Sequence, residues 1–350
     1  MKRANIPIFI PHRGCPNACV FCNQHTILGV VGTPALEILL ARARAEIETA
    51  LTTISPDTMC EIAYFGGSFT GIEPDLMEAL LGLAAEYVAA GRVSSIRCST
   101  RPDYVGDAVL DRIAPYPVGT VELGVQSLSD AVLFACRRGH TAEDALAAIA
   151  RLRGRGYAVV GQMMLGLPNS TFADERETAE RLIAAGVDAV RIYPTLVLQE
   201  TQLADRMAQG KYSPLSLDEA VSRTADLLDL FDQADVEVLR VGLQETDGLR
   251  EPGTVLGGPC HPAFGELAMG ECFYRRAEKL LQGEIPCGAD VTIAVPRGRT
   301  SAMIGQKKKN LSRLCAKFGM KTIKVVEIDT LLGYNIKIVH NRKEERNPCI

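Results

Sequence analysis

The 350-residue chain lacks any run of apolar residues as long as a membrane-spanning helix, although 47% of its residues are hydrophobic. About 20 consecutive apolar residues are needed to cross a bilayer, so we expect no membrane span. The first residues, MKRANIPIFIPHRG, are basic and then apolar, but the apolar part is short and no small-residue cleavage site follows. We therefore expect no signal peptide. A chain of this length and apolar content can bury a sizeable core.

The cysteines do not form the pattern of a disulfide framework. Their number, 11, is odd, and the chain is far longer than the small secreted domains that disulfides stabilise. Cysteines in such a chain suit a reducing compartment, so we expect a cytoplasmic protein.

The charges are distributed unevenly along the chain. The net charge is −4, but residues 289–350 hold 13 Lys and Arg against 5 Asp and Glu, which leaves 25 against 37 for the first 288 residues. An acidic body with a basic C-terminal domain indicates a polyanionic partner, and a solvated charged surface is the alternative. For residues 341–350 we adopt the second interpretation, a solvated tail.

Predicted strands and helices alternate through the first 245 residues, and most of the helices end in glycine. Thr141, with Asp144 three residues later, marks one helix start. The predicted strands are 6–11, 61–67, 95–100, 120–127, 158–168, 188–195 and 236–244. This alternation predicts an α/β fold with parallel strands, a partial or full (β/α) TIM-type barrel over 1–245. A connecting loop and helix over the barrel (246–288) and a small α+β domain (289–340) would follow.

Period-two alternation assigns polar side chains to one face of several predicted strands. The apolar face of 120–127 holds Val121, Leu123 and Val125, and the other face holds Glu122 and Gln126. The polar face also holds Arg97, Ser99, Arg101, Arg191 and Tyr193 from two further strands. Barrel interiors are usually apolar, and buried charge is unfavourable unless it is paired or used. A polar lumen therefore predicts a ligand at the C-terminal ends of the strands, and internal salt bridges are the alternative.

Three cysteines lie within eight residues of the stretch GCPNACVFCN: Cys15, Cys19 and Cys22. Soft sulfur ligands select zinc or an iron–sulfur cluster. Structural zinc needs four ligands, so His12 or His25 would have to supply the fourth. A [4Fe–4S] cluster usually has four Cys ligands, so three thiolates leave one iron open to another ligand. Three unrelated buried thiols are the remaining alternative.

The spacing C-x3-C-x2-C, with Phe21 before the last cysteine, resembles the signature of the radical S-adenosylmethionine (SAM) superfamily. The resemblance implies that Cys15, Cys19 and Cys22 hold a [4Fe–4S] cluster. SAM would bind the open iron and be cleaved reductively to a 5′-deoxyadenosyl radical. It also implies an electron donor such as flavodoxin or ferredoxin. The stretch YFGGSFTG is similar to the family's Gly-Gly-Glu motif, which binds the SAM amino group. Gly66 and Gly67 match that motif, and Ser68 replaces its glutamate.

Further motifs resemble the catalytic subunit of the elongator complex, which modifies the wobble uridine of transfer RNA. They are FIPHRGCPNACVFC, STRPDY, VELGVQS, RRGHT and RIYPTLVLQETQL, within residues 9 to about 215. The resemblance implies that Glu122, Gln126 and Arg138 lie near the SAM ribose or carboxylate. It also implies that Arg101 lines the pocket and that Phe21 marks the adenine side.

Two features depart from the elongator pattern. The gap between the first two cysteines is shorter than in that subunit. About 90 residues follow Pro259, too few for its acetyltransferase domain, and they hold no acetyl-CoA loop. We therefore expect RNA modification without acetyl transfer, because a fold and a cofactor do not fix the product.

The basic segment 291–328 resembles a KH domain, whose Gly-x-x-Gly loop contacts a nucleic-acid backbone. Gly305 matches the first glycine, and Lys308, between Lys307 and Lys309, replaces the second. Lysine would add charge toward phosphate and alter the loop geometry. The lysines also lie at a predicted helix N-terminus, where cations do not stabilise the helix dipole, so we expect an anion there. A small domain that only packs against the barrel is the alternative.

Four residues around the predicted connecting segment could suggest a second metal site: Cys260, His261, Cys272 and Cys287. Their spacing is irregular, so we interpret these thiols as ordinary buried cysteines. His140 would cap a helix or touch SAM, and we favour the structural role.

Three functions therefore remain open. The first is a radical SAM enzyme that modifies transfer or ribosomal RNA. The second is a radical SAM enzyme that acts on a small molecule or porphyrin, because the segment MLGLPNST is similar to one in oxygen-independent coproporphyrinogen oxidases. The third is a non-catalytic RNA-binding protein with structural zinc. The oligomeric state cannot be predicted.

Overall fold

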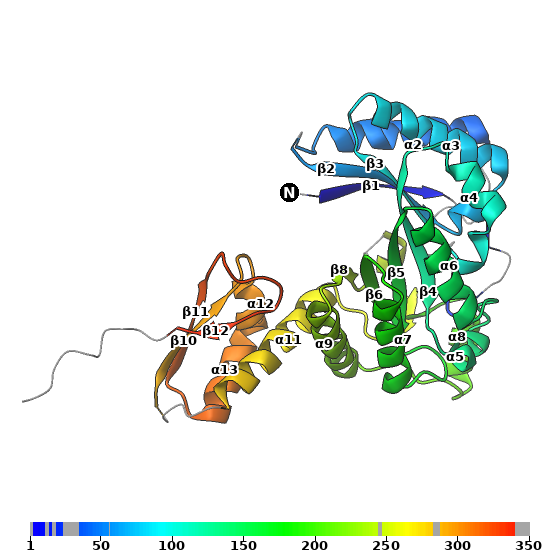
Figure 1. Ribbon diagram of the computed structural model, residues 1–350. Helices are drawn as coiled ribbons and strands as arrows, with labels where there is room; N and C mark the ends of the chain where they lie inside the picture. The colour runs from blue at the N-terminus through cyan, green and yellow to red at the C-terminus, as the bar shows by residue number, and fades with distance from the viewer. Residues whose placement is uncertain are drawn as a thin grey trace, which may run out of the picture. The chain divides into compact units, whose positions relative to one another are not determined.

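Seven parallel strands form the largest sheet of the computed structural model (Figure 1), which describes residues 3–10, 14–15, 19–23, 35–55, 57–243, 247–282 and 288–339. The strands are β1 (Arg3–Ile10), β2 (Met59–Gly66), β3 (Ser95–Thr100), β4 (Val118–Gln126), β5 (Ala158–Leu165), β6 (Ala189–Pro194) and β8 (Glu237–Val241). They pair in the order in which they occur along the chain. All seven predicted strands and the parallel arrangement are confirmed.

Helices connect successive strands of this sheet. They are α2 (Leu36–Leu51), α3 (Pro74–Ala89), α4 (Asp107–Ile113), α5 (Asp130–Ala135), α6 (Ala142–Gly154) and α7 (Phe172–Ala184). Helix α6 begins with the predicted capping box, in which the Thr141 hydroxyl and the Asp144 carboxylate each bond the other residue's backbone N–H. The same box, Thr171 with Asp174, starts α7. Short 3-10 turns follow β2 (Phe69–Gly71) and β3 (Pro102–Tyr104).

The predicted alternation on the strands agrees with the observed packing. Val121, Leu123 and Val125 of β4 are fully buried, as are Val190 and Ile192 of β6. The opposite face is only partly buried: Glu122 is buried, whereas Gln162, Arg191 and Tyr193 are half-buried.

The sheet is a partial barrel, since β1 and β8 lie at its two edges and do not pair with each other. An ion pair joins the first residues of these edge strands, where Arg3 Nη1 lies 3.0 Å from Glu237 Oε2. Both side chains are exposed, so the pair contributes little to stability. The predicted α/β fold, in its partial-barrel form, is confirmed.

The chain divides into two compact units: residues 1–216 with 236–260, and residues 217–235 with 261–350. The predicted boundary at residue 245 lies within the first unit, and helix α9 (Leu217–Gln233) belongs to the second. The reason is its packing on α11 (Phe264–Leu281). Arg275 pairs with Asp226 of α9 at 2.6 Å, and Arg276 pairs with Asp232 at 2.7 Å.

Smaller elements complete the first unit. They are β7 (Val197–Leu198), α8 (Gln202–Ala208), α10 (Asp247–Arg250) and β9 (Val255–Gly257). Strands β7 and β9 form a separate antiparallel pair.

The end of the second unit has a β-α-α-β order. Strand β10 (Asp290–Val295) is followed by α12 (Thr300–Ile304), a 3-10 turn (Gln306–Lys308), α13 (Lys309–Phe318) and β11 (Thr322–Glu327). Strand β10 pairs with β11 in parallel and with β12 (Lys337–Ile338) in antiparallel orientation. The predicted strands and the helix after the lysines are therefore present.

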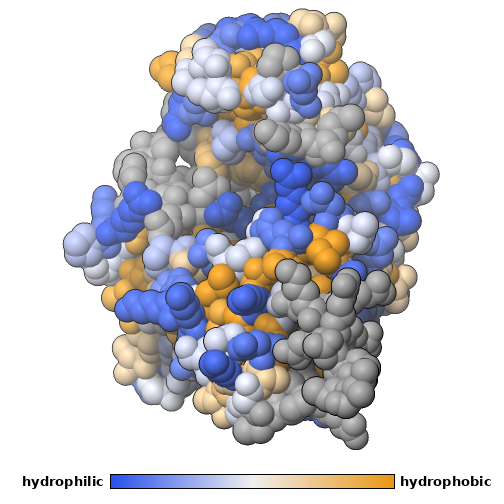
Figure 2. All heavy atoms as spheres, turned by 90° about the vertical axis from the view of Figure 1, so that its left-hand side faces the viewer, coloured by the Kyte–Doolittle hydropathy of each residue, from blue (hydrophilic) through white to orange (hydrophobic). Residues whose placement is uncertain are grey.

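Polar residues cover much of the face seen in Figure 2, and apolar side chains gather in smaller areas between them. Among the described helices, none is long and apolar enough to cross a membrane.

Candidate active site

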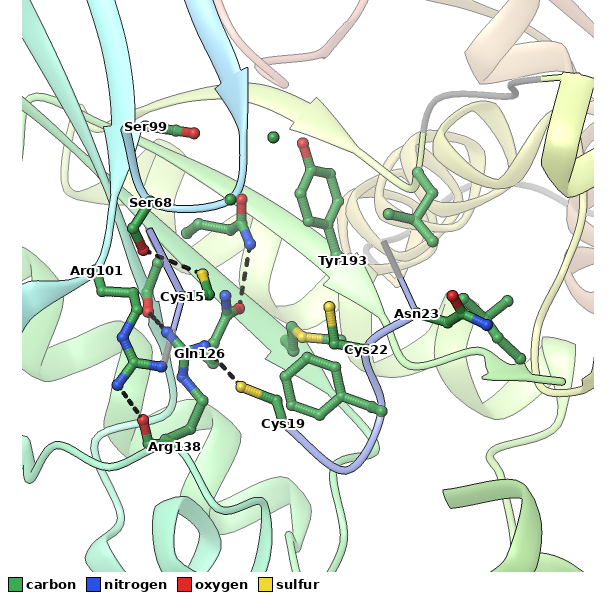
Figure 3. A pocket seen from close by; sticks show the side chains of 18 of the residues that line it. Cys15, Cys19, Cys22, Asn23, Ser68, Ser99, Arg101, Gln126, Arg138 and Tyr193 are labelled. Carbon is green, nitrogen blue, oxygen red and sulfur yellow. Dashed lines mark hydrogen bonds between the residues drawn. The ribbon is translucent and has the colours of Figure 1, made fainter. Parts of the chain in front are cut away.

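A cavity of about 690 Å³ lies at the C-terminal ends of the seven strands (Figure 3). Its walls come from the segments that directly follow β1, β2, β3 and β8 and from the last residues of β4, β5 and β6. The lining includes Cys15, Cys19, Phe21, Cys22, Gly66, Gly67, Ser68, Ser99, Arg101, Glu122, Gln126, Arg138, Gln162, Met164 and Tyr193. All eleven cluster- and SAM-binding residues predicted from the sequence thus line one cavity, at the end of a parallel sheet where ligands bind.

The three cysteines are free thiols held by specific contacts. Cys15 Sγ lies 3.3 Å from the hydroxyl oxygen of Ser68, and Arg138 Nη1 donates to Cys19 Sγ at 3.2 Å. The backbone N–H of Cys22 donates to the carbonyl of Cys19 at 3.0 Å, which forms a tight turn. Within the described ranges, no three Cys, His, Asp or Glu side chains converge as they would around one metal ion. His12 and His25, considered as zinc ligands, lie outside the described residues.

Two buried arginines place positive charge beside the thiols. Arg101 is 3% exposed and Arg138 is 6% exposed. Arg101 makes a bidentate pair with Asp103 and donates to the carbonyl of Arg138. Burial disfavours the charge of Arg101, but Asp103 and, more weakly, Cys19 and Cys15 keep its pKa above the ordinary value.

Each of these arginines keeps one buried N–H without a hydrogen-bond partner among the described protein atoms, Nη1 of Arg101 and Nε of Arg138. An unsatisfied buried donor is unfavourable, so such groups at a cavity wall indicate a missing acceptor. The chemistry of this set, three cysteines lining one cavity with two partly unpaired guanidinium groups, suits an anionic iron–sulfur cluster with a polar ligand beside it, although the three sulfurs do not converge among the described residues.

The segment after β2 approaches the end of β1 closely. Gly66 has φ +128°, and a Cβ there would overlap the backbone oxygen of Ile10, so only glycine fits. Ser68 is fully buried, and its hydroxyl contacts Cys15. The predicted role of Ser68 toward a SAM amino group stays a prediction, whereas its contact with the cysteine was not foreseen.

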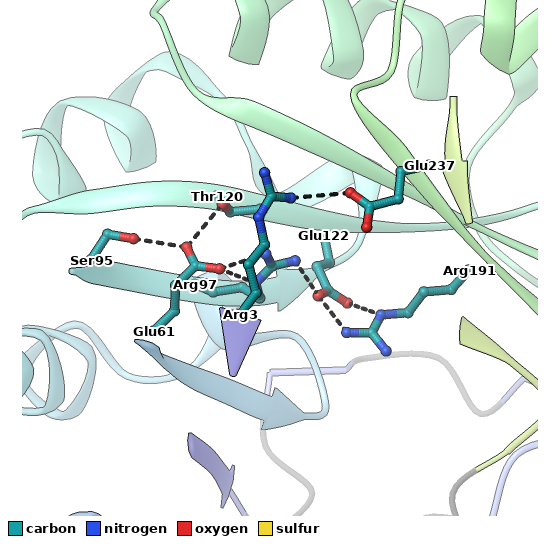
Figure 4. Close-up of polar contacts among 8 residues, drawn as sticks. All are labelled: Arg3, Glu61, Ser95, Arg97, Thr120, Glu122, Arg191 and Glu237. Atoms are coloured by element: carbon teal, nitrogen blue, oxygen red, sulfur yellow. Dashed lines mark hydrogen bonds and ion pairs between the residues drawn. The ribbon is translucent and has the colours of Figure 1, made fainter. Parts of the chain in front are cut away.

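Glu122 lines the cavity, but its carboxylate is already bonded (Figure 4). Oε1 accepts from Arg97 Nη1 at 2.8 Å, and Oε2 accepts from Arg191 Nε at 2.8 Å. Arg97 Nε also donates to Glu61 Oε2 at 2.9 Å. Burial alone would raise the pKa of Glu61, but Arg97, Ser95 and Thr120 hold it below the ordinary value. We call Glu61, Arg97, Glu122 and Arg191 the lumen ion-pair network.

The alternative interpretation, internal salt bridges, is observed in one part of the lumen, and the predicted ligand stays a prediction for the cavity beside it. The lumen ion-pair network fills one region with internal salt bridges, and the cavity occupies another. Alternation along the strands cannot distinguish the two, because it reports the face of a side chain and not its partner.

Gln126 ends β4 in a strained conformation. Its φ is +69°, in the left-handed region, and the β4–β5 pairing shifts register between Gly124 and Gln126. A positive φ is uncommon for a residue with a side chain, and residues strained in this way cluster at active sites. Its side-chain oxygen accepts from Gln162 Nε2 at 3.3 Å. Gln162 was missed by the sequence reasoning, although it is the one polar side chain in the apolar run of β5.

His140 does not line this cavity. Its Nδ1 lies 3.2 Å from the carbonyl of Thr141, and Nε2 is buried with no partner among the described protein atoms. Burial, with the nearby charge of Arg138, lowers the pKa of His140 to about 4, so the ring is neutral near pH 7.

This burial predicts a pH-dependent stability. In the unfolded chain His140 binds a proton below about pH 6.5, whereas in the folded protein it stays neutral down to about pH 4. The free energy of unfolding therefore falls as the pH drops from about 6.5 to about 4. From pH 7 to 5 the loss is about 2 kcal/mol, at about 1.4 kcal/mol per pKa unit. Urea unfolding at both pH values measures it, and His140→Leu should remove the difference. An equal loss in the variant would show that other groups cause it.

The predicted RNA-binding residues lie in the second unit, beside a cavity of about 590 Å³ that Gly305, Lys307 and Lys309 help to line. Gly305 has φ +73°, and a Cβ there would lie 2.8 Å from Asn310 Cγ. Lys307 and Lys308 have φ of 51° and 61°. Lysine was expected to alter the loop, yet Lys308 adopts the left-handed conformation that glycine favours.

The three lysines of this loop are exposed, and no ion-pair partner for them is found among the described residues. Two consecutive left-handed residues with side chains cost about 1–2 kcal/mol each. Strain and unpaired charge at one loop are typical of a binding site.

The residues suspected of an auxiliary site do not assemble one in the described part of the chain. Cys272 is buried, Cys260 is exposed, and His261 Nδ1 accepts from the backbone of Ala263 at 3.0 Å. Cys287 lies outside the described residues.

Comparisons with known proteins agree with this geometry. Residues 9–182 match the family model described as the Radical SAM superfamily, and residues 187–272 match the Radical_SAM C-terminal domain. A tRNA uridine(34) acetyltransferase of Methanocaldococcus jannaschii is 28% identical over 200 residues, 51% of this chain and 37% of that protein. Elongator complex protein 3 of Saccharomyces cerevisiae is 28% identical over 262 residues, 63% of this chain and 47% of that protein.

Among solved structures, the Elp3 of Methanocaldococcus infernus with an N-terminal deletion shares the fold, with a TM-score of 0.60 and 21% identity. The match covers 79% of this chain and 63% of that one. The chain thus spans less than half the length of the two sequence relatives named above.

Proposed function

This chain belongs to the radical SAM superfamily, with a [4Fe–4S] cluster and SAM as cofactors, and on that premise we propose that it modifies a nucleotide in RNA. Transfer RNA is the favoured substrate, and ribosomal RNA is the alternative. We propose further that the modification needs no acetyl transfer; what supports this is that the described residues of 261–339 form α11 and the β-α-α-β end of the second unit, with no acetyl-CoA loop among them.

Cys15, Cys19 and Cys22 would hold the cluster. When bound, the cluster and SAM supply a 5′-deoxyadenosyl radical that abstracts a hydrogen atom from the substrate. Arg138 orients Cys19, and Ser68 orients Cys15. Arg101 and Arg138 add positive charge beside the cysteines, which would stabilise an anionic cluster.

Apolar residues complete the walls of the cavity. Phe21 and Tyr193 pack against the buried cluster of Val20, Val132, Cys136, Met164 and Leu167. A wall of this kind limits the access of water, so a reactive intermediate would react with the substrate and not with water. Gln126, Gln162 and Ser99 supply hydrogen-bonding groups that would orient a polar ligand.

The observation that carries the RNA proposal is the similarity to proteins named as tRNA uridine(34) acetyltransferase and Elongator complex protein 3. The exposed lysine loop supports it, because unpaired cations beside a cavity suit a phosphate backbone.

Anaerobic reconstitution tests the proposal. The protein is incubated with SAM, dithionite and either transfer or ribosomal RNA, and digested nucleosides and 5′-deoxyadenosine are quantified by mass spectrometry. We expect 5′-deoxyadenosine and one RNA-dependent change in nucleoside mass. SAM cleavage with every nucleoside unchanged would refute the RNA substrate, and no cleavage at all would refute the enzyme.

Lys308→Gly separates stability from RNA binding at the loop. Glycine relieves the left-handed strain, so the free energy of unfolding should stay the same or rise by up to about 1 kcal/mol. Loss of one phosphate contact should weaken RNA binding and reduce the slope of log affinity against log salt by about 1. Fluorescence anisotropy with labelled RNA over a salt series measures the RNA affinity and its salt dependence.

Lys324→Ala is the matched control, because Lys324 is an exposed lysine on β11 of the same unit. It should leave both the affinity and the slope nearly unchanged. If Lys308→Gly behaves like this control, the loop is not the RNA-binding site.

A further inference from the structure

A second cavity, of about 590 Å³, lies within the second unit and shares no described residue with the active-site cavity. Its walls come from the beginning of α9, from α11, from α12 and from the lysine loop, residues 305–309 (Figure 1). We call it the α11 cavity. Its volume is usual for a pocket that holds a small ligand, about 300–1,000 Å³. The lysine loop therefore borders a space that part of a ligand can enter.

A buried asparagine holds the walls of the α11 cavity together. Asn310 is 4% exposed, and its Nδ2 donates to the carbonyl of Gly270 in α11 at 2.7 Å and to that of Ala302 in α12 at 3.3 Å. A Cβ at Gly270 would lie only 3.2 Å from the carbonyl oxygen of Ala302, so glycine permits this close approach of the two helices. The cavity is thus formed before any ligand binds, which lowers the entropic cost of binding.

The charge available beside the lysine loop is positive. Lys307, Lys309 and Arg299 line the cavity, and none of them has a carboxylate partner in the part of the chain that the structure describes. Arg299 Nη1 donates instead to Met269 Sδ at 3.2 Å. A thioether sulfur is a weak acceptor and carries no charge, so it leaves the guanidinium charge unneutralised. An anionic group of a ligand would therefore bind at this wall.

The wall formed by the beginnings of α9 and α11 carries the opposite charge. Asp218 and Glu266 line it, both are exposed, and no cation among the described residues pairs with either. Each lies in the first turn of its helix, where negative charge is favourable without a cation. A further carboxylate, Glu271, is already paired with Arg275 at 3.2 Å and with Arg313 at 2.7 Å. This wall would repel a second phosphate but can accept hydrogen bonds from N–H groups.

Apolar side chains supply much of the remaining lining. They are Leu217 and Val221 of α9 and Leu267 and Met269 of α11, all half-buried. A matching ligand therefore has an anionic end, an apolar body and N–H groups. A nucleotide combines all three in its phosphate, the face of its base and the edge of that base. A free inorganic anion has only the first, and a lipid has no N–H edge to set against the two carboxylates.

We propose that the α11 cavity takes one nucleotide of single-stranded RNA, with its phosphate at Lys307 and Lys309 and its base against α11. The inference rests on the proposed RNA substrate and adds to it the form of the strand and the place of one base. A base inside an RNA duplex is stacked and paired, whereas an unpaired base can turn into a pocket. Lys308 is exposed and does not line the cavity, so its charge is left for a neighbouring phosphate. This favours a strand over a free mononucleotide, which has the same chemistry.

Ser301→Phe in the full-length protein tests the cavity. Ser301 is an exposed residue of α12 that lines the cavity, so a ring there fills the space without opening the core. Fluorescence anisotropy with a labelled single-stranded RNA should show an affinity about tenfold below that of the parent protein. Because no charge changes, the slope of log affinity against log salt should stay the same. The affinity for a labelled RNA duplex, weaker in the parent protein, should not fall further.

Ser312→Phe is the matched control, because Ser312 is an exposed serine of α13 that does not line the cavity. It should bind the single strand as the parent protein does. A second measurement needs no variant: RNA that contains thiouridine is cross-linked to the parent protein by near-ultraviolet light, and mass spectrometry should find the base on peptides of α9 or α11. Equal affinities in the two serine variants, or cross-links confined to other elements, would overturn the proposal.

The remaining outcomes separate this inference from the RNA proposal. Duplex binding as tight as that of the single strand would overturn the single-stranded form. Uridine monophosphate that competes at the affinity of the RNA would assign the cavity to a free nucleotide. A parent protein that binds no RNA contradicts the proposed function and this inference with it. A parent protein that binds RNA while Ser301→Phe binds equally well contradicts this inference alone.

Discussion

Cys19→Ala should yield a protein without the brown colour of an iron–sulfur cluster and with SAM cleavage at background. Cys19 is 8% exposed, lines the active-site cavity and receives the hydrogen bond of Arg138. With two cysteine ligands left, two irons of the cluster would lack a protein ligand. The iron that binds SAM would then no longer differ from the second unligated iron. Visible absorbance, iron content and 5′-deoxyadenosine production, all measured anaerobically, report the loss.

Cys60→Ala is the matched control for this variant. Cys60 is a buried thiol of β2, 2% exposed, that does not line the active-site cavity. Its replacement should keep both the colour and the cleavage activity. If Cys19→Ala binds iron at the parent's stoichiometry, or if the parent protein is colourless and holds zinc, the assignment of this loop is wrong.

Glu122→Ala should destabilise the first unit by about 3–5 kcal/mol, because it leaves Arg191 without its carboxylate and leaves buried Arg97 with Glu61 alone. Arg97 is 9% exposed and Glu122 is 2% exposed, so water cannot replace the lost partner easily. Arg191 loses both of its bonds to this carboxylate, at 2.8 and 2.9 Å. Urea unfolding of the parent and the variant measures the difference.

Glu86→Ala provides the comparison at the surface. Glu86 pairs with Arg44 at 2.9 Å, but the two side chains are 62% and 52% exposed. Exposed pairs contribute at most about 1 kcal/mol, so this variant should change little. A loss below about 1 kcal/mol in Glu122→Ala would show that water or another group satisfies the two arginines.

The sheet could be predicted from the sequence because its strands depend on local patterns, and the cysteine loop could be proposed as a site for the same reason. Cys15, Cys19 and Cys22 lie within eight residues, and short apolar runs indicate strands without reference to distant partners. The capping box of Thr141 and Asp144 is equally local, since both partners lie within four residues.

Features that depend on distant partners were not predictable. Helix α9 has ordinary amphipathic spacing, so nothing local shows that its acidic residues pair with Arg275 and Arg276 of α11. The sequence likewise could not show that Glu122 of β4 is bonded to Arg97 of β3 and to Arg191 of β6. Charge and alternation indicate that such residues are buried, but the partner is chosen by the fold.

The backbone strain at Gln126 and the exposure of Phe134 belong to the same group. Glutamine has no preference for a positive φ, so the strain arises from the register shift between β4 and β5. Phenylalanine is usually buried, and a sequence gives no reason to place this one on the surface.

The sequential order of the strands also governs how the site is assembled during synthesis. Each strand pairs with its predecessor, so the sheet can grow from β1 onward as the chain leaves the ribosome. The cysteine loop emerges first, and Arg138, which holds Cys19, follows 119 residues later. At about 5–20 residues per second the thiols wait about 6–24 s for that guanidinium. We therefore expect the cluster to assemble after the sheet has folded. In the nascent chain the three thiols would lack the surrounding groups of the site.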